Sequence, residues 1–178
     1  MAARRILIVG GGVAGPTLAL VLAKHLPSSQ ITILERSITQ SELGQVVDVE
    51  GPSQEILSRL HLLPLLREAS TREQGIEVVN EQGELVGRLP AGQSGGASKE
   101  IEIMRPRLSE VIHNATNEHE NVHWRFGKTV TAIEERLDDL LAQVSDVEKK
   151  ETQKEEFDLV VAADGLRSDI EISSSRRA

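Results

Sequence analysis

Apolar residues near the start of the chain follow two different patterns. Ile6–Val9 and Ile31–Leu34 are short continuous apolar runs, the pattern expected of strands buried on both faces of a parallel sheet. Between them, apolar residues from Leu18 to Leu26 recur with helical spacing and stop before Pro27. The segment therefore predicts a strand, a helix and a second parallel strand, which together form a βαβ unit.

The middle of the chain alternates between the two kinds of pattern. Helical spacing predicts one helix with apolar positions from Ile56 to Leu66, and a second helix that begins at Pro106 and ends near Asn117. Extended or strand-like patterns occur at residues 45–50, 76–79, 84–89, 101–104 and 122–126.

The last part of the chain predicts β structure. Residues 128–157 read as an antiparallel meander with a charged tip, and Asp158–Ala163 reads as a third buried strand. We therefore expect an α/β fold over residues 1–170, with a mostly parallel Rossmann-like sheet and an inserted meander. Residues 171–178 are polar and without periodicity, which predicts a loose tail.

Composition narrows the possible functions. The 178 residues carry a formal net charge of −8, and they include two Phe, one Trp, no Tyr and no Cys. An acidic chain with so few aromatic residues is not expected to bind nucleic acid, which requires basic groups and stacking platforms. No apolar run approaches the roughly 18 residues of a membrane span, so we expect a cytoplasmic protein without one.

A glycine-rich turn carries the first candidate chemistry. The pattern Gly10-x-Gly12-x-x-Gly15 follows the first strand and opens the helix, and Glu35 ends the next strand about 20 positions later. In this context the glycines allow a tight turn, close approach to a pyrophosphate and close helix packing. Glu35 would accept hydrogen bonds from ribose hydroxyls and repel a 2′-phosphate, so this first site should not bind NADP. The alternative is an ordinary strand–turn–helix with an incidental surface Glu35.

Two further motifs lie at strand ends. Arg105 stands between a strand and a helix, where its planar fork could bind phosphate or polar cofactor oxygens; the alternative is a solvated surface Arg. Asp164-Gly165 ends the third buried strand, where open sheets bind ligands; the alternative is a turn that Asp164 stabilises. The histidines show no metal-binding spacing, and the serines have no paired His and Asp. We therefore predict neither a metal site nor a catalytic side chain.

In this order the three motifs resemble those of the FAD-dependent, para-hydroxybenzoate hydroxylase-like flavin monooxygenases. The matching segments are Ile6–Gly15 with Leu34–Arg36, Arg105-x-x-Leu108, and Asp158–Ser168. Residues 44–49 and 101–105 look most like the branch with the tetracycline-inactivating and natural-product tailoring enzymes. The resemblance implies an FAD cofactor, reduced by NAD(P)H, and O₂-dependent hydroxylation of an aromatic or polyketide-like small molecule.

The resemblance also implies roles for particular residues. Glu35 would hold the adenosine ribose, Arg105 would contact the ribityl-pyrophosphate part of FAD, and Asp48 would lie near the flavin. Asp164-Gly165 would serve both FAD and the transient docking of NAD(P)H. The full set expected to bind the cofactor is Gly10, Gly12, Val13, Ala14, Gly15, Glu35, Arg36, Asp48, Arg105, Asp164 and Gly165.

The chain also departs from the family pattern. An Arg usually follows the Ser of the third motif, but Ser168 is followed by Asp169 and then by Glu171, which reverses the local charge. The later Gly-Asp segment of the family is absent, so we expect an N-terminal, truncated portion of such an enzyme. Two other functions stay open: a non-catalytic remnant or interaction protein with a degenerate nucleotide site, and a small NAD-binding reductase. Arg105 and Asp164-Gly165 argue against the reductase, which needs neither.

Overall fold

The computed structural model describes residues 3–40, 42–71, 74–90, 101–166 and 168–174. The chain divides into two compact units, one formed by residues 1–41 and 112–178 and the other by residues 42–111. The division falls within helix α4 (Arg105–Thr116). Among the described residues, no helix is long and apolar enough to cross a membrane.

A four-stranded parallel sheet is the centre of the first unit. Its strands are β1 (Arg5–Val9), β2 (Gln30–Glu35), β7 (Val122–Phe126) and β11 (Leu159–Ala162), in the order β11-β1-β2-β7. Helix α1 (Ala14–His25) joins β1 to β2, which confirms the predicted βαβ unit. The continuous apolar runs become the two central strands, as buried parallel strands require.

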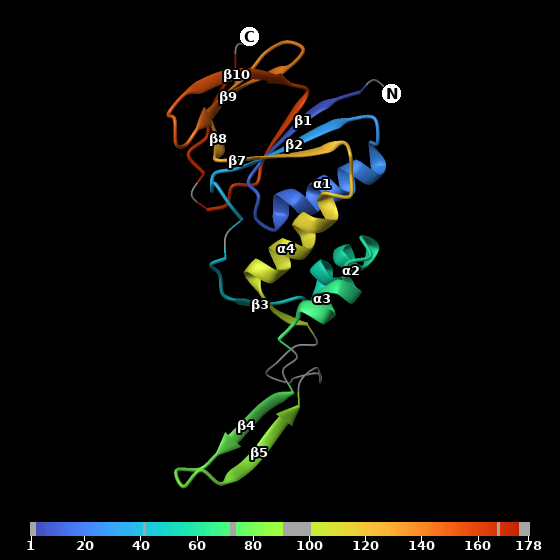
Figure 1. Ribbon diagram of the computed structural model, residues 1–178, viewed down its shortest axis with the longest axis vertical. Coiled ribbons are helices and arrows are strands. Elements are labelled where there is room, and N and C mark those ends of the chain that lie inside the picture. The colour runs from blue at the N-terminus through green and yellow to red at the C-terminus, as the bar shows by residue number, and fades with distance from the viewer. Residues whose placement is uncertain (1–2, 41, 72–73, 91–100, 167, 175–178) are drawn as a thin grey trace. The chain divides into compact units, whose positions relative to one another are not determined.

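Alternate residues of these strands enter two different cores. On one face, Ile6, Ile8 and Ile33 pack against Ala19 and Ala23 of α1. The small alanines allow the helix to lie close to the sheet. The basic residues Lys24 and His25 in its last turn interact favourably with the negative end of the helix dipole. The other face packs against the second sheet of the unit (Figure 1). The buried side chains on that face are Leu7, Val9, Leu34, Val130, Ile133, Ala142, Val144 and Phe157.

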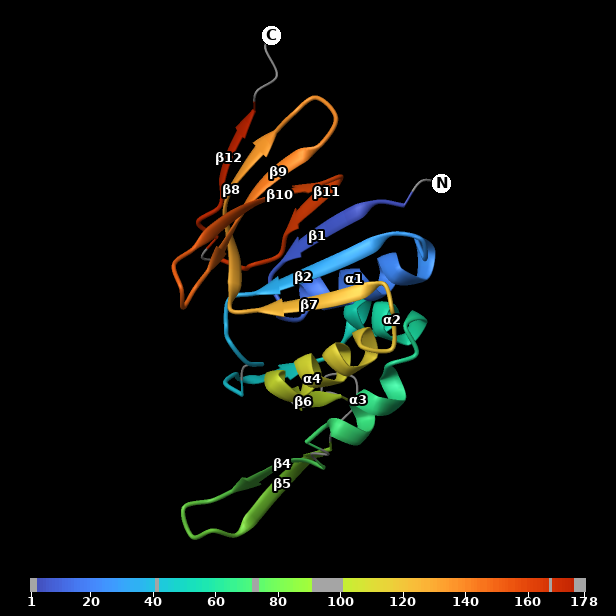
Figure 2. The same ribbon diagram turned by 45° about the horizontal axis from the view of Figure 1, so that its top comes forward.

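The second sheet contains the predicted antiparallel meander. Its strands are β8 (Lys128–Glu135), β9 (Leu140–Asp146) and β10 (Thr152–Phe157), and β12 (Glu171–Ser174) pairs with β8 in parallel (Figure 2). Arg125 on β7 donates two hydrogen bonds to the carboxylate of Glu155 on β10, at 2.7 and 2.8 Å. This fork-shaped ion pair fixes the meander to the edge of the parallel sheet.

The second unit, residues 42–111, combines helices with two short antiparallel ladders. Strand β3 (Val46–Asp48) pairs with β6 (Glu102–Met104), and β4 (Gly75–Val79) forms the predicted hairpin with β5 (Leu85–Pro90). The other elements are α2 (Gly51–Arg59), α3 (Leu63–Ala69) and the beginning of α4.

Two elements differ from the sequence-based prediction. The single helix expected over Ile56–Leu66 is divided between α2 and α3, because Pro64 lacks an amide hydrogen and its ring clashes with the carbonyl four residues earlier. His61, at the break, has φ of 60°. Residues 171–174, expected to begin a loose tail, form β12 instead. A strand at the edge of a sheet is held by backbone hydrogen bonds, so it does not need an apolar repeat. Residues 175–178 lie outside the described part of the chain.

Phe157 tests the core between the two sheets. Its side chain is 6% exposed in that core, whereas Leu137, in the β8–β9 turn, is 83% exposed. We expect Phe157→Ala to lower the free energy of unfolding by about 3–5 kcal/mol, because it removes buried apolar area and leaves a cavity. Leu137→Ala should change it by less than about 0.5 kcal/mol. Urea unfolding followed by circular dichroism compares the two, and equal losses would contradict this packing.

Candidate functional site

The glycine-rich turn is held by backbone contacts with two neighbouring strands. The amide of Gly10 donates to the carbonyl of Leu34 at 2.8 Å, and the amide of Ala163 donates to the carbonyl of Val9 at 2.7 Å. Gly10 has φ of 114°, and a Cβ added there would lie 2.3 Å from the Ala163 oxygen. Only glycine fits at this position, and its absence of a side chain lets the first and third sequence motifs meet.

Gly15 allows the close packing of the helix that was predicted from the sequence. A Cβ on this residue would lie 2.1 Å from the carbonyl oxygen of Gly10, far inside van der Waals contact. The residue is buried in the first turn of α1, so its missing side chain lets the helix begin directly on the turn. The predicted reason for a glycine at this position is therefore visible in the geometry.

The N-terminus of α1 has the features of an anion site. The structure describes all of this helix, and neither a capping side chain nor an acidic residue occurs in its first turn. Val13 and Ala14 lie at its start, beside Gly12. Unpaired amide hydrogens and the positive end of the helix dipole favour negative charge at such a terminus. The local sequence thus leaves the end of the helix open to a phosphate.

Glu35 lies at the end of β2, and its carboxylate accepts hydrogen bonds from the backbone of the same turn and of the following segment. Its Oε2 accepts a hydrogen bond from the amide of Gly11 at 2.8 Å, and its Oε1 accepts one from the amide of Ser37 at 2.8 Å. Two backbone amides therefore orient the carboxylate, and each oxygen keeps a second lone pair for another donor. Ribose hydroxyl groups are donors of this kind.

A cavity of about 210 Å³ opens beside these groups. It is smaller than the roughly 300–1,000 Å³ of a pocket for a whole drug-sized ligand, and suits one part of a longer cofactor. Its wall comes from the ends of β1 and β2, the start of β8 and the segment after β11. The lining residues are Val9, Gly10, Leu34, Glu35, Arg36, Lys128, Thr129, Val130, Thr131, Asp164 and Asp169.

The cavity is lined by several residues that were predicted to bind the cofactor and by others that were not. Gly10, Glu35, Arg36 and Asp164 were expected, and they line one space although they are far apart in the sequence. Gly165, next to Asp164, has φ of 87° and open space at its missing Cβ, so it serves the turn rather than a close contact. Arg167 of the third motif lies outside the described residues.

The residues of β8 on the cavity wall were missed by sequence reasoning. Lys128, Thr129 and Thr131 were assigned only to a meander strand, and Asp169 only to a departure from the motif. The β8 residues reach the cavity because β8 packs beside β2 through the core shared by the two sheets, and Asp169 reaches it from the segment between β11 and β12. Alternation along a strand does not reveal such a contact; only the packing partner of the strand does.

Lys128 is tied to the β9–β10 turn. Its Nζ donates to Asp146 Oδ2 at 2.5 Å, while Asp146 Oδ1 accepts hydrogen bonds from the amides of Glu148 and Lys149. The hydrogen bond from Lys128 is the largest of the effects that lower the pKa of Asp146 to about 2. Asp146 therefore holds one end of the cavity wall in place.

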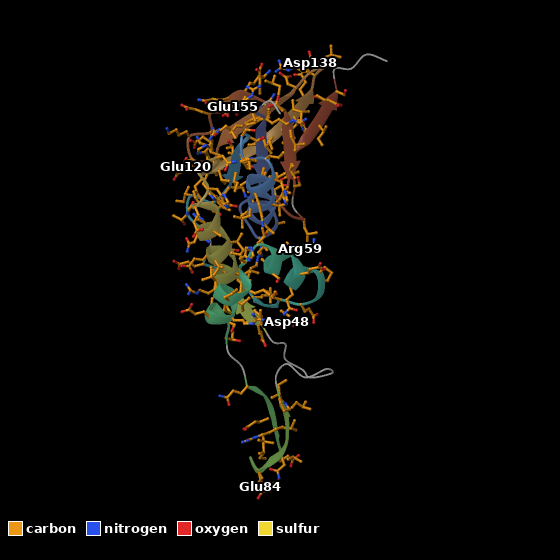
Figure 3. All side chains as sticks on the ribbon, turned by 90° about the vertical axis from the view of Figure 1, so that its right-hand side faces the viewer. Asp48, Arg59, Glu84, Glu120, Asp138 and Glu155 are labelled. Carbon is orange, nitrogen blue, oxygen red and sulfur yellow. The ribbon has the colours of Figure 1, made fainter. Side chains whose placement is uncertain are left out.

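Asp48 and Arg105 belong to the unit of residues 42–111. Asp48 is exposed on β3, where it pairs with Glu102 (Figure 3). Arg105 directly follows Met104, the partner of Val46. Asp48 and Arg105 thus lie at opposite ends of one short ladder. The Arg105 amide donates to the carbonyl of Gln45 at 3.0 Å, and a Cβ on Gly44 would lie 3.0 Å from the Arg105 Cβ. The backbone at Gly44 thus holds Arg105 where the strand becomes a helix.

Comparison with known proteins identifies the family. The sequence profile of the FAD binding domain family matches residues 4–174. The chain belongs to this family. It is 36% identical over 172 residues to the monooxygenase CTB7 of Cercospora beticola, covering 94% of this chain and 39% of that protein. It is 30% identical over 171 residues to the FAD-dependent monooxygenase asL4 of Sarocladium schorii, covering 93% of this chain and 38% of that protein.

Solved structures share the fold. The tetracycline destructase Tet(51) aligns with a TM-score of 0.71 at 24% identity, over 94% of this chain and 40% of its own. The flavin-dependent monooxygenase PieE, solved with FAD and substrate, aligns with a TM-score of 0.74 at 19% identity, over 94% of this chain and 31% of its own. The Rossmann-like α/β fold predicted from the sequence is confirmed. The chain spans about two fifths of the length of the curated relatives it matches.

Substituting Gly15 tests the packing of the FAD-binding turn. We expect Gly15→Ala to destabilise the protein by about 1–3 kcal/mol, because the added methyl group forces α1 away from the carbonyl of Gly10. Gly87→Ala is the matched control, since nothing lies within 4 Å of a Cβ at that position. Thermal unfolding of both variants checks the prediction. A Gly15→Ala variant as stable as the control would show that the turn is looser than described.

The Lys128–Asp146 pair predicts a dependence of stability on pH. Because folding lowers the pKa of Asp146 from 3.8 to about 2, its contribution to stability is present above about pH 4 and is lost as the pH falls toward 2. Wild type should therefore exceed Asp146→Asn in stability at pH 5, and the gap should shrink between pH 4 and 2. Urea unfolding across this range measures the gap. A gap that does not vary with pH would contradict the role of this ion pair.

Proposed function

We propose that residues 1–170 are the FAD-binding domain of a monooxygenase that uses NAD(P)H and O₂ to hydroxylate an aromatic or polyketide-like small molecule. The observation that supports it most is the cavity where the glycine turn, Glu35 and Asp164 meet. The family and the names of the relatives support the same reaction. The chain alone covers about two fifths of those relatives, so the whole reaction is part of the proposal.

The residues of the cavity fit the adenosine and pyrophosphate half of FAD. Side chains at Gly10 and Gly15 would fill the space of the turn, the start of α1 is uncapped, and Glu35 keeps lone pairs free. We assign the pyrophosphate to Gly12, Val13 and Ala14 at the start of the helix, where amide hydrogens offer donors. The ribose is assigned to Glu35, and the rest of the cavity, with Arg36, to the adenosine.

Three assignments depend on the resemblance to flavin monooxygenases. Arg105 is proposed to contact the ribityl-pyrophosphate part of FAD and Asp48 to lie near its flavin end. Asp164-Gly165 is proposed to serve FAD and the docking of NAD(P)H. Arg105 suits the role because its guanidinium offers a rigid fork of donors and its backbone is fixed by Gln45 and Gly44. Asp48 is exposed, as a residue that meets a ligand must be.

In this proposal the protein selects and places the cofactor. FAD, when bound, supplies the redox chemistry that takes electrons from NAD(P)H and activates O₂. Glu35 binds the two ribose hydroxyls and repels a 2′-phosphate, so the site distinguishes FAD from NADP. Asp164 and Asp169 add negative charge to the cavity, which disfavours a second phosphate there.

Reconstitution with FAD is the direct test of this function. Purified chain mixed with FAD and passed through a desalting column should be yellow, with a bound-flavin absorption spectrum. Chain that stays colourless and shows no FAD binding by calorimetry would overturn the proposed cofactor. Rapid oxidation of NADH by the flavin-free chain would instead favour the NAD-binding reductase. Incorporation of ¹⁸O from ¹⁸O₂ into an aromatic acceptor would then test the monooxygenase reaction in the flavin-loaded protein.

Glu35→Ala tests the ribose assignment. We expect the dissociation constant for FAD to rise about tenfold or more, because hydrogen bonds from the ribose to a charged acceptor are lost. Glu120→Ala is the matched control, since Glu120 is an exposed carboxylate in the loop before β7 (Figure 3). Isothermal titration calorimetry with FAD and with ADP compares the variants. An unchanged constant in Glu35→Ala would refute the assignment.

A further inference from the structure

Two aromatic residues of the first unit, Trp124 and Phe126, form one cluster with His113 beside the glycine turn. The chain has two Phe, one Trp and no Tyr, and Trp124 and Phe126 on β7 stack with His113 of α4. The ring centroids of His113 and Trp124 are 4.5 Å apart with an interplanar angle of 10°, and those of Trp124 and Phe126 are 5.3 Å apart at 10°. None of these three residues belongs to the sequence motifs that resemble the family.

The register of the parallel sheet explains why the stack lies there. Trp124 pairs with Ile33 and Phe126 pairs with Glu35, so these four side chains lie on one face of the sheet. It is the face covered by α1. Glu35 therefore shares its face with the two rings, and the turn that carries Gly11 crosses that face directly after β1.

Trp124 is in direct contact with the turn. A Cβ added to Gly11 would lie 2.7 Å from Trp124 Cζ3, 2.8 Å from Glu35 Cβ and 2.9 Å from Glu35 Oε2. The indole ring and the Glu35 side chain thus both lie against the side of Gly11 where a side chain would stand, and the Gly11 amide donates to that carboxylate. The ring fills the space beside the hydrogen bond between Gly11 and Glu35.

The indole ring is itself fixed in place. Its Nε1 donates to Thr116 Oγ1 at 2.8 Å, and the Thr116 hydroxyl donates to the carbonyl of His113 at 2.6 Å. Thr116 is 0% exposed, so this chain of hydrogen bonds is shielded from water. Burial lowers the pKa of His113, which keeps that ring neutral in the stack at neutral pH. Two kinds of contact therefore fix the indole ring of Trp124: stacking with His113 and Phe126, and the hydrogen bond to Thr116.

We propose that Trp124 is a positioning residue for the nucleotide: its ring packs against Gly11 on the same side as Glu35, and so holds the amide and the carboxylate in the hydrogen-bonded orientation that binds the ribose. This inference rests on the proposed FAD site. It adds a residue outside the glycine motif, acting through Gly11 and Glu35 rather than by touching the cofactor. The free turn is already arranged for binding, which lowers the ordering cost of association.

Trp124→Leu tests this role through the ligand-free turn and through FAD affinity. We expect faster hydrogen exchange at the Gly11 amide without ligand, and a rise of about tenfold in the dissociation constant for FAD, the size of one charge-assisted hydrogen bond. Trp124→Phe, which keeps an aromatic ring, should recover part of both effects. Val122→Ala is the matched control: it lies on the same strand, 8% exposed in the α1 core, and should lower the melting temperature without changing exchange at Gly11.

A double-mutant cycle with Glu35→Ala separates positioning from general destabilisation. If Trp124 acts through Glu35, Trp124→Leu should weaken FAD binding little further once the carboxylate is gone. Additive losses, or unchanged exchange at Gly11 in folded Trp124→Leu, would overturn the inference. If Trp124→Leu does not fold, the same two measurements on Trp124→Phe, hydrogen exchange at Gly11 and the dissociation constant for FAD, test the inference. If wild type binds neither FAD nor ADP, the proposed function fails, and the exchange at Gly11 alone decides the role of Trp124.

Discussion

Parallel pairing of β1 with both β2 and β11 is the constraint on which the site depends. Parallel strands run in one direction, so the segments that follow them emerge at the same edge of the sheet. The turn after β1, Glu35 at the end of β2 and Asp164 after β11 meet there for this reason. Gly10 completes the arrangement, because any side chain on it would strike the carbonyl of Ala163 and separate β1 from the segment after β11.

The same sheet must also be covered on both faces, and the two covers serve different purposes. Helix α1 brings an uncapped N-terminus to the glycine turn, and its small Ala19 and Ala23 let it lie close to the sheet. The meander covers the other face and supplies Lys128 and Thr129 to the cavity. Burial of apolar area thus places polar groups at the site, because α1 and β8 both begin beside the carboxyl edge of the sheet. Stability and ligand binding depend on the same packing.

The sequence predicted some of these features well because their causes are local. The apolar runs, the glycine spacing and Pro106 at a helix start each act over a few residues, and the βαβ unit, the hairpin, the meander and α4 follow from them. The division of α2 from α3 at Pro64 also has a local cause, but the helical spacing of the leucines on both sides of Pro64 predicted a single helix. The β12 strand was missed because its pairing with β8 is non-local and needs only backbone groups.

The candidate site was predictable only where a motif carries its own geometry. Gly10, Glu35 and Asp164 belong to such motifs, whereas Thr131 and Asp169 reach the cavity through packing that no spacing reveals. Trp124 illustrates the same limit: its position follows from the register of β7 against β2. Sequence patterns therefore identify groups that touch a ligand through local turns, and they overlook groups that hold those turns in place.

The described cavity explains why the motifs indicate the cofactor more sharply than the substrate. In the proposed assignment, Glu35, the helix N-terminus and the glycine turn bind a ribose and a pyrophosphate, parts that many nucleotides share. On that assignment these groups lie away from the reacting atoms of the cofactor, so changes in the substrate leave them untouched. Selection for a particular hydroxylation must act on other side chains, which vary with each substrate and form no fixed motif. A fold that keeps one nucleotide-binding site can thus serve many oxidations.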